Sequence, residues 1–245
     1  MLPQWPEPAG VHAYCSERDG GVSKAPYDTL NLGDHVGDEP AAVAENRRRF
    51  ASQFDVRPVF LKQVHGRGVV RLDAATPDGT EADACWTTER GVACTMMVAD
   101  CLPVLLAPRA GGIVGAAHCG WRGLADGVLE ALWQDMAPLA GAPGGMLAWL
   151  GPCIGPEAFE VGPEVRAAFV HRDPGAAAAF RPHGAGKFLA DLPALARRRL
   201  AAMGVVAVHG NDGSRAWCTV AQSSRFFSHR RDRVSGRLAA SIWLA

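Results

Sequence analysis

Short apolar runs separated by only a few residues constrain the fold of this 245-residue chain more than any other feature. Three of them, residues 92–98, 102–106 and 112–117, follow one another within a single stretch. Runs of this length suit β-strands, because a helix usually needs ten or more residues. The spacing predicts neighbouring strands, and the 28 glycines and 17 prolines scattered along the chain agree with many tight turns.

Helical periodicity appears between the apolar runs. Leu124, Val128 and Leu132 recur at helical spacing after a glycine-rich turn, with Asp126 in the expected first turn, where an anion suits the helix dipole. Further expected elements are a strand at 146–150, helices at 163–170 and 189–203, and a strand at 205–209. This mixed order predicts an α+β fold: a single-domain sandwich of mixed or antiparallel sheets with flanking helices over residues 1–245.

Composition narrows the class of partner. Hydrophobic residues make up 48%, charged residues 20%, and the net charge is zero, so no global field attracts nucleic acid or an anionic membrane. No run reaches the roughly 20 apolar residues of a membrane span, and the first residues lack the pattern of a secretion signal. Seven widely spaced cysteines fit a reduced compartment better than a disulfide framework. We therefore expect a cytoplasmic protein acting on a small molecule, with its oligomeric state left open.

Three segments carry candidate metal ligands next to glycines or strand ends: KQVHG, ADCLP and AHCGWRG. Their histidines and first cysteine are His65, Cys101 and His118. Imidazole nitrogen and thiolate sulfur are the usual zinc donors, and a catalytic zinc site commonly has three protein ligands and one open position. The spacing matches no finger or ribbon, so ordinary packing is the alternative for each residue. The residue types predict an open zinc site.

Two charged neighbours extend this site. Asp100 is adjacent to Cys101 and is expected either to orient a ligand imidazole or to act as a general base. Arg122 lies at the start of an expected helix, where backbone N–H groups favour an anion. A helix cap for Asp100 and a surface ion pair for Arg122 are the alternatives.

Other thiols leave two alternatives open. Cys119 and Cys153 also lie beside glycines, so a Cys/His hydrolase is possible if a nearby base lowers the pKa of one of them. Cys119 as a fourth ligand would instead close the site into a structural zinc module. Adjacent residues of a strand point to opposite faces, which argues against joint ligation by His118 and Cys119.

A set of ordered segments covers nearly the whole chain: GGVSKAPYDTLNLGDHVGDEPAAVAENRRRF, LKQVHG, EADACWTTERGVACTMMVADCLPVLLA, VGAAHCGWRGL, WLGPCIGPEAFEVGPEV, DLPALARRRL and FFSHRRDRVSGRLAASIWL. In this order they resemble the laccase-domain or polyphenol-oxidase family of bacterial cytosolic proteins, understood as purine nucleoside phosphorylases with adenosine deaminase activity. The chain differs from the usual family pattern in carrying Cys119 and His229 where a small residue and a tyrosine are common.

The resemblance implies an activity and a set of site residues. His65, Cys101 and His118 match the family's metal ligands, and Asn31 and Arg47, in segments that line its pocket, are expected to contact substrate or phosphate. The implied enzyme converts adenosine, inosine or methylthioadenosine with phosphate into free base and ribose-1-phosphate. The same zinc would activate water for deamination of adenosine.

Copper oxidation is the remaining alternative, because the family carries a laccase label. A His₂Cys set with an axial methionine is a copper geometry, and Met96 and Met97 lie a few residues before Cys101. The eight histidines contain no His-X-His pair of the kind that several coppers require, and both methionines lie in an apolar run suited to core packing. Zinc, rather than copper, is the expected cofactor.

Overall fold

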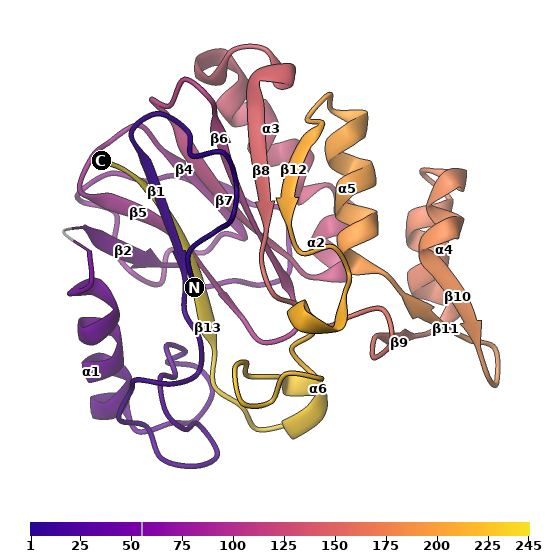
Figure 1. Ribbon diagram of the computed structural model, residues 1–245, viewed down its shortest axis with the longest axis horizontal. Coiled ribbons are helices and arrows are strands. Elements are labelled where there is room, and N and C mark those ends of the chain that lie inside the picture. The colour runs from indigo at the N-terminus through magenta and orange to yellow at the C-terminus, as the bar shows by residue number, and fades with distance from the viewer. Residues whose placement is uncertain (55) are drawn as a thin grey trace.

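Two β-sheets face each other, and helices cover the outer side of the larger sheet (Figure 1). The computed structural model describes residues 1–54 and 56–245. The strands are β1 (Val11–Cys15), β2 (Arg57–Phe60), β3 (Val69–Arg71), β4 (Ala84–Thr87), β5 (Val92–Val98), β6 (Leu102–Pro108), β7 (Val114–Cys119), β8 (Met146–Leu150), β9 (Glu160–Val161), β10 (Phe180–His183), β11 (Lys187–Ala190), β12 (Ala207–Gly210) and β13 (Leu238–Leu244). The helices are α1 (Pro40–Ala51), α2 (Trp121–Asp126), α3 (Val128–Ala140), α4 (Pro163–Val170), α5 (Leu192–Ala202) and α6 (His229–Asp232).

Both main sheets mix parallel and antiparallel neighbours. The four-stranded sheet has the order β1-β13-β5-β2, and the six-stranded sheet has the order β12-β8-β6-β7-β4-β3. β13 pairs antiparallel with both β1 and β5, whereas β2 runs parallel to β5. The α+β class with mixed and antiparallel sheets expected from the sequence is therefore confirmed.

Alternation along β6 explains how one strand serves two cores. Leu102, Val104 and Leu106 pack into the core beneath the helices, and Leu105 and Ala107 pack into the core between the two main sheets. Successive side chains of a strand point to opposite faces, so a strand buried on both sides reads as an unbroken apolar run. This double burial is why the run was recognisable in the sequence.

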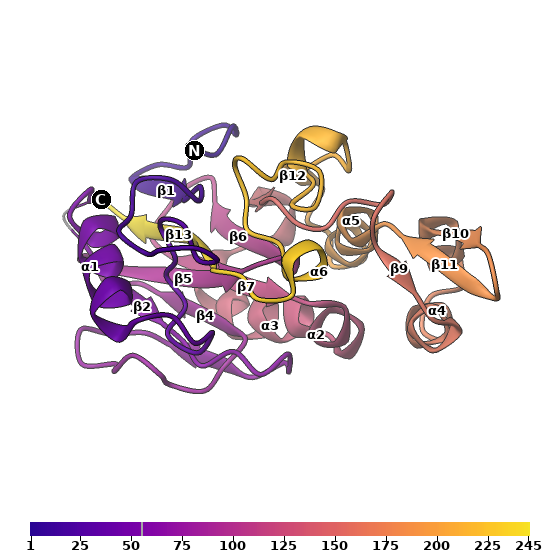
Figure 2. The same cartoon turned by 90° about the horizontal axis from the view of Figure 1, so that it is seen from below.

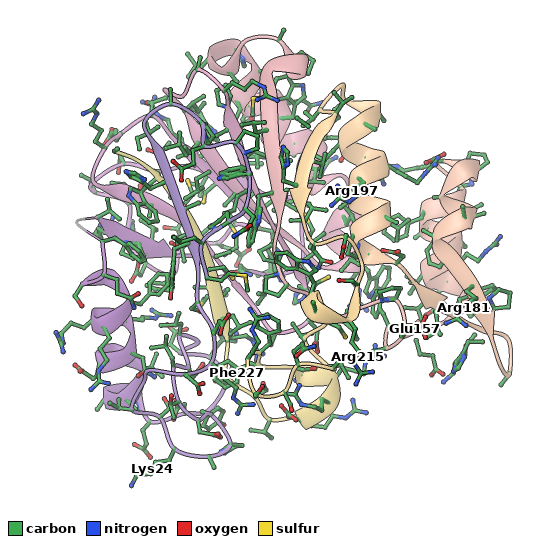
Figure 3. The ribbon with its side chains drawn as sticks, in the orientation of Figure 1. Lys24, Glu157, Arg181, Arg197, Arg215 and Phe227 are labelled. Atoms are coloured by element: carbon green, nitrogen blue, oxygen red, sulfur yellow. The ribbon has the colours of Figure 1, made fainter. Side chains whose placement is uncertain are left out.

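A smaller unit extends from one end of the molecule. β9, β10 and β11 form a separate three-stranded sheet beside α4, beyond α5 (Figure 2). On the side of α5 that faces β12, the Arg197 side chain donates hydrogen bonds to the carbonyls of Val208 and Asn211 (Figure 3). Arg197 thereby ties a helix to the edge strand of the six-stranded sheet.

Several expected boundaries were wrong. The expected helix at 189–203 begins at Leu192, because residues 187–190 pair with β10 and β9 as strand β11. The helix after the glycine-rich turn is divided at Gly127, so Asp126 ends α2 rather than beginning a longer helix. β7 runs to Cys119, two residues beyond the expected strand, and β12 begins at Ala207. The other expected elements agree with the structure to within two residues.

None of the helices in the described part of the chain combines the length and the apolar character that a membrane crossing requires.

Candidate metal centre

Three side chains from separate segments meet at one end of the six-stranded sheet. The ligand atoms of His65, Cys101 and His118 all lie within 4.8 Å of one another. The Cys101 Sγ lies 3.6 Å from the His65 Nε2, and the two imidazole centres are 4.8 Å apart. Sulfur and two nitrogens at this separation form a donor set that suits zinc or copper.

The β6–β7 hairpin brings two of these ligands together. Pro103 pairs with His118 and Leu102 with Cys119 in the antiparallel register, so Cys101, which immediately precedes β6, lies beside the C-terminal end of β7. His118 is almost fully buried, Cys101 is partly exposed and His65 is exposed. The site is therefore anchored in the sheet on one side and open to solvent on the other.

The loop that carries His65 is held by side chains on both sides. The Gln63 amide mimics a strand neighbour: its Oε1 accepts from the Met97 backbone N–H and its Nε2 donates to the Met97 carbonyl, each at 2.8 Å. His65 adopts a φ of 62°, a left-handed conformation that is costly for a residue with a Cβ atom. The loop therefore keeps this conformation only because its surroundings impose it.

Asp83 provides the second anchor. Its fully buried carboxylate accepts hydrogen bonds from the backbone N–H groups of Val64, His65 and Gly66 at 3.1, 2.9 and 2.7 Å. The His118 Nδ1 donates to the same carboxylate at 2.9 Å, which leaves Nε2 for a metal. Asp83, and not Asp100 as expected, orients a ligand imidazole.

Gly120 lets the ligands approach one another. A Cβ atom at this position would lie 2.8 Å from the His65 Cδ2 and 3.1 Å from the Cys101 Sγ. Gly120 has an ordinary φ of −65°, so its role is the space that it leaves rather than its backbone freedom. The glycine in the AHCGW segment is thus a steric requirement of the donor group.

Electrostatics favour a thiolate at Cys101. Burial alone would raise the pKa of the Cys101 thiol, but the charge of His118 and hydrogen bonds from both imidazoles lower it to about 6. Burial would lower the pKa of His118, and the Cys101 and Asp83 charges instead raise it to about 9. Without a metal the pair is a thiolate and an imidazolium, and the thiolate is the form that binds metals.

A cavity of about 470 Å³ opens over the donor group. Its lining includes the three ligands, the arginines 122, 230 and 237, the histidines 35 and 229, and an apolar set formed by Met97, Ile154, Phe159 and Leu192. A volume of this size and a wall with polar and apolar parts are typical of a small-molecule site. Arg122 and Asp100, both singled out from the sequence, line this cavity.

Asp100 is held rigidly in the cavity wall. Its Oδ1 accepts a 2.6 Å hydrogen bond from the Thr219 hydroxyl, and its Oδ2 accepts another of 2.6 Å from the Arg230 backbone N–H. Its φ of 95° is unusual for an aspartate. The residue is thus fixed next to Cys101 by contacts from a distant part of the chain, not by a ligand imidazole.

Asn31 and Arg47 lie behind the cavity rather than in its lining. Asn31 is fully buried, and its Oδ1 accepts from the backbone N–H groups of Gly33 and Arg237 at 2.9 Å each. The Arg47 guanidinium donates to the Leu32 carbonyl and lies over the Phe60 ring. Their polar atoms are already bonded within the protein, so the structure places these two expected substrate contacts in a layer that supports the cavity.

Cys119 and Cys153 are not activated thiols. Both are fully buried, and burial raises the pKa of each well above its usual value. Cys119 belongs to the core beneath the helices, on the opposite face of β7 from His118, and is outside the donor group. The argument against Cys119 as a fourth ligand agrees with this arrangement.

A family model described as multi-copper polyphenol oxidoreductase laccase matches residues 12–245. This chain belongs to that family. The resemblance read from the ordered segments is thereby confirmed.

Similar members of the laccase family include proteins with a different activity in their names. A protein of Pseudomonas aeruginosa named purine nucleoside phosphorylase is 52% identical over 246 residues, covering 100% of this chain and 98% of that protein. The purine nucleoside phosphorylase YfiH of Escherichia coli is 51% identical with the same coverage. Full-length identity at this level relates whole proteins rather than a shared motif.

Solved structures of the family share the fold. A crystal structure of a Neisseria meningitidis protein superimposes with a TM-score of 0.94 at 47% identity, covering 100% of this chain and 98% of that chain. The crystal structure of YlmD from Geobacillus stearothermophilus gives a TM-score of 0.88 at 32% identity, covering 96% of this chain and 92% of the other.

Sequence reasoning missed three residues of the site. Asp83 bonds to His118, and two arginines line the cavity, Arg230 and Arg237. All three lie 18 or more residues from the nearest ligand in sequence. For Asp83 a signal existed, since an acidic residue directly precedes a fully buried strand in EADACW. A charge in that position needs partners, because burying an unpaired carboxylate is costly.

Proposed function

We propose that this chain is a zinc-dependent purine nucleoside phosphorylase, acting on adenosine, inosine and methylthioadenosine, and that it also deaminates adenosine. One observation carries the proposal: a His₂Cys donor group and three arginines share a single cavity of about 470 Å³. The names of its relatives, at 52% and 51% identity, support phosphorolysis. Both reactions act on small purine compounds, and phosphorolysis also needs an anion site.

The donor group fits zinc. It offers one thiolate and two imidazoles, and Gly120 leaves the space in which their ligand atoms converge. When bound, zinc supplies Lewis-acid polarisation of an oxygen ligand and lowers the pKa of water. His65, Cys101 and His118 would hold it, and the open side faces the cavity.

Arg237 is the strongest candidate for gripping phosphate. Its backbone is fixed by Asn31, and its Nη1 donates only to the carbonyls of Ser235 and Gly236. Among residues 1–54 and 56–245, no carboxylate lies within ion-pair distance of its guanidinium. A partly buried cation without a counter-ion in a cavity attracts an anion, and Arg122 and Arg230 line the same space.

The apolar part of the lining suits the purine. Ile154, Phe159 and Leu192 offer a surface on which an aromatic base can pack. Asp100, whose two carboxylate oxygens accept hydrogen bonds from Thr219 and from the Arg230 backbone, is the general base that we assign to the deamination of adenosine. In phosphorolysis, attack of phosphate on the anomeric carbon breaks the bond to the base, and the leaving base takes up a proton.

A copper-dependent polyphenol oxidase is the second candidate because the family model bears that description. The described residues contain one group of three or more histidine, cysteine or acidic donors, whereas the description refers to several coppers. Met97 lines the cavity, but its Sδ accepts a 3.8 Å hydrogen bond from the Arg47 guanidinium. The phosphorylase proposal accounts better for the arginines.

A Cys/His hydrolase is the third candidate, and one observation favours it. In space the Asp83 carboxylate contacts the His118 imidazole, which in turn contacts the Cys101 thiolate, and this is the order of a nucleophilic triad. The nucleophile would be Cys101 and not Cys119 or Cys153. Such an enzyme would work without metal, so chelation separates it from the phosphorylase.

The deciding experiment follows product formation from adenosine by reverse-phase chromatography, with and without phosphate. The protein carries one measured equivalent of zinc, and Cys101→Ala serves as the ligand-deficient control. We expect adenine only when phosphate is present, inosine alone without phosphate, inosine together with hypoxanthine when phosphate is present, and none of these products from the variant. Unchanged adenosine with the zinc-loaded protein would reject the proposal, and activity that survives chelation would favour the thiol hydrolase.

A further inference from the structure

Asp83 connects the two histidines of the donor group, although it is not itself a ligand. Its Oδ1 accepts from the His118 Nδ1 and from the His65 backbone N–H, each at 2.9 Å. Its Oδ2 accepts from the N–H groups of Val64 and Gly66. Four donors thus fill the four lone-pair positions that an ionised carboxylate offers.

The two histidines differ in how they are held. His118 is 3% exposed and belongs to β7, so its ring is confined by the sheet. His65 is exposed and lies in a loop with a left-handed backbone, so the sheet does not fix it. Because Asp83 is 0% exposed and accepts hydrogen bonds from both residues, the position of the loop histidine depends on the same carboxylate that orients the histidine of β7.

We propose that Asp83 is a positioning residue that joins the residue 64–66 loop and the His118 imidazole into one unit, so that zinc binding and ordering of the loop are energetically coupled. The inference rests on the zinc site of the proposed function, but not on any reaction there. A metal held by the His118 imidazole would strengthen donation from the Nδ1 of this ring to the carboxylate. The coupling free energy is the same in both directions, so if zinc binding stabilises the ordered loop, the ordered loop raises the affinity for zinc by the same factor.

Asp83→Asn tests the coupling with little change in shape. An amide has only one acceptor oxygen, so its NH₂ group must face two of the four donors whichever way it turns. Either the Val64 and Gly66 amides or the His118 and His65 donors lose their acceptor. Replacing such a group next to a metal-bound histidine typically weakens metal binding by about 10- to 100-fold.

The matched control is Asn211→Asp. This exchange is equally isosteric, and Asn211 is also a buried side chain, with three hydrogen bonds of its own. Asn211 is 2% exposed and bonds to Gly151, Cys153 and Gly213, away from the donor group. Loss of stability alone should weaken zinc binding equally in both variants. A positioning role should affect Asp83→Asn alone.

Two measurements decide the matter. Zinc affinity is measured by competition with a chromophoric chelator, without nucleoside, and amide hydrogen exchange of residues 64–66 is followed with and without zinc. We expect zinc to slow this exchange in the wild type, and Asp83→Asn to weaken zinc binding by about 10- to 100-fold and abolish the slowing. Affinity unchanged in Asp83→Asn, or lowered as much in Asn211→Asp, would overturn the proposal.

If Asp83→Asn fails to fold, the exchange measurement on the wild type still tests the proposal. Hydrogen exchange at residues 64–66 that is the same with and without zinc would overturn the coupling. Neither measurement involves catalysis. A protein that shows the coupling but leaves adenosine intact would overturn the proposed function and leave this inference standing.

Discussion

Arg237 combines partial burial with a charge that no carboxylate of the described chain neutralises at ion-pair distance. Burial lowers the pKa of its guanidinium, while Cys101 and Asp100 act in the opposite direction. Its backbone N–H donates to Asn31 of the LNLGD segment, and its side chain lines the cavity. Arg237 therefore connects that segment to the site.

Arg237→Gln should raise the KM for phosphate by about 10-fold or more, because a hydrogen bond to a charged group contributes roughly 1.5–3 kcal/mol. Steady-state phosphorolysis at varied phosphate measures the effect. Arg233→Gln, four residues earlier and outside the cavity lining, is the control and should leave the phosphate KM unchanged. Equal KM values for Arg237→Gln and the wild type would remove Arg237 from the anion site.

Gly120→Ala should empty the metal site without unfolding the protein. The new Cβ would contact the His65 ring at 2.8 Å and the Cys101 sulfur at 3.1 Å, so the exposed imidazole must move away. We expect less than about half an equivalent of zinc after dialysis, measured by atomic emission. Gly144→Ala, which meets nothing within 4 Å, is the matched control, and full zinc occupancy in Gly120→Ala would contradict the steric argument.

The sequence predicted the three donor residues of the site but not the residues that hold them or line the cavity beside them. His65, Cys101 and His118 were recognisable because donor side chains stood next to glycines and strand ends and matched a family pattern. Asp83 and Arg237 were not, because their function depends on contacts with residues 17 to 35 and 206 positions away. Asn31 was selected from the right segment, but its contribution is to hold a backbone.

The junction of α2 and α3 shows what a single backbone conformation does to an element. Gly127 ends one helix and begins the next with a φ of 98°, so an apparently continuous apolar periodicity is divided into two helices. Two arginines, Arg172 and Arg199, donate to the Ala125 carbonyl at the end of α2. These cations satisfy an acceptor that the interrupted helix leaves unpaired.

Gly127→Ala should lower the free energy of unfolding by about 1–2 kcal/mol, the cost of a left-handed conformation for an L-residue. Space is available, since the nearest atom to the new Cβ would be 3.4 Å away, so strain and not collision is the cause. Urea denaturation measures the change, with Gly145→Ala as the control at ordinary φ. A loss no larger than in the control would mean that the junction relaxes.

The ends of helices and strands were predictable where a local sequence pattern determines them. They were not predictable where pairing with distant strands determines them. Strand β5 and helix α4 agree with the expected residues because burial on both faces and Pro163 mark them locally. The start of α5 was wrong because residues 187–190 have no local feature that distinguishes a helix from a strand. Their state is fixed by the neighbouring β9 and β10.

The core between the two main sheets unites the molecule, and Trp149 of β8 is its largest fully buried side chain. Its Nε1 is buried without a hydrogen-bond partner among the described residues. Trp149→Ala should therefore lower the free energy of unfolding by about 3–5 kcal/mol through the cavity that it leaves. Chemical denaturation measures this directly.

Trp149→Phe separates the volume of that side chain from its N–H group. Phenylalanine keeps much of the apolar surface and removes a buried donor that has no partner, so the expected loss is less than about 1.5 kcal/mol. If Trp149→Phe were as destabilising as Trp149→Ala, the indole N–H would have to contribute a hydrogen bond that the structure does not contain.

β13 has a consequence for synthesis of the chain. Residues 238–244 lie between β1 and β5, so the four-stranded sheet stays open until these late residues leave the ribosome. The donor group, from His65 to His118, is synthesised more than a hundred residues earlier. A nascent chain truncated before Leu238 therefore exposes two unpaired strand edges, which favours aggregation. A late stop codon would produce an insoluble polypeptide rather than a shorter enzyme.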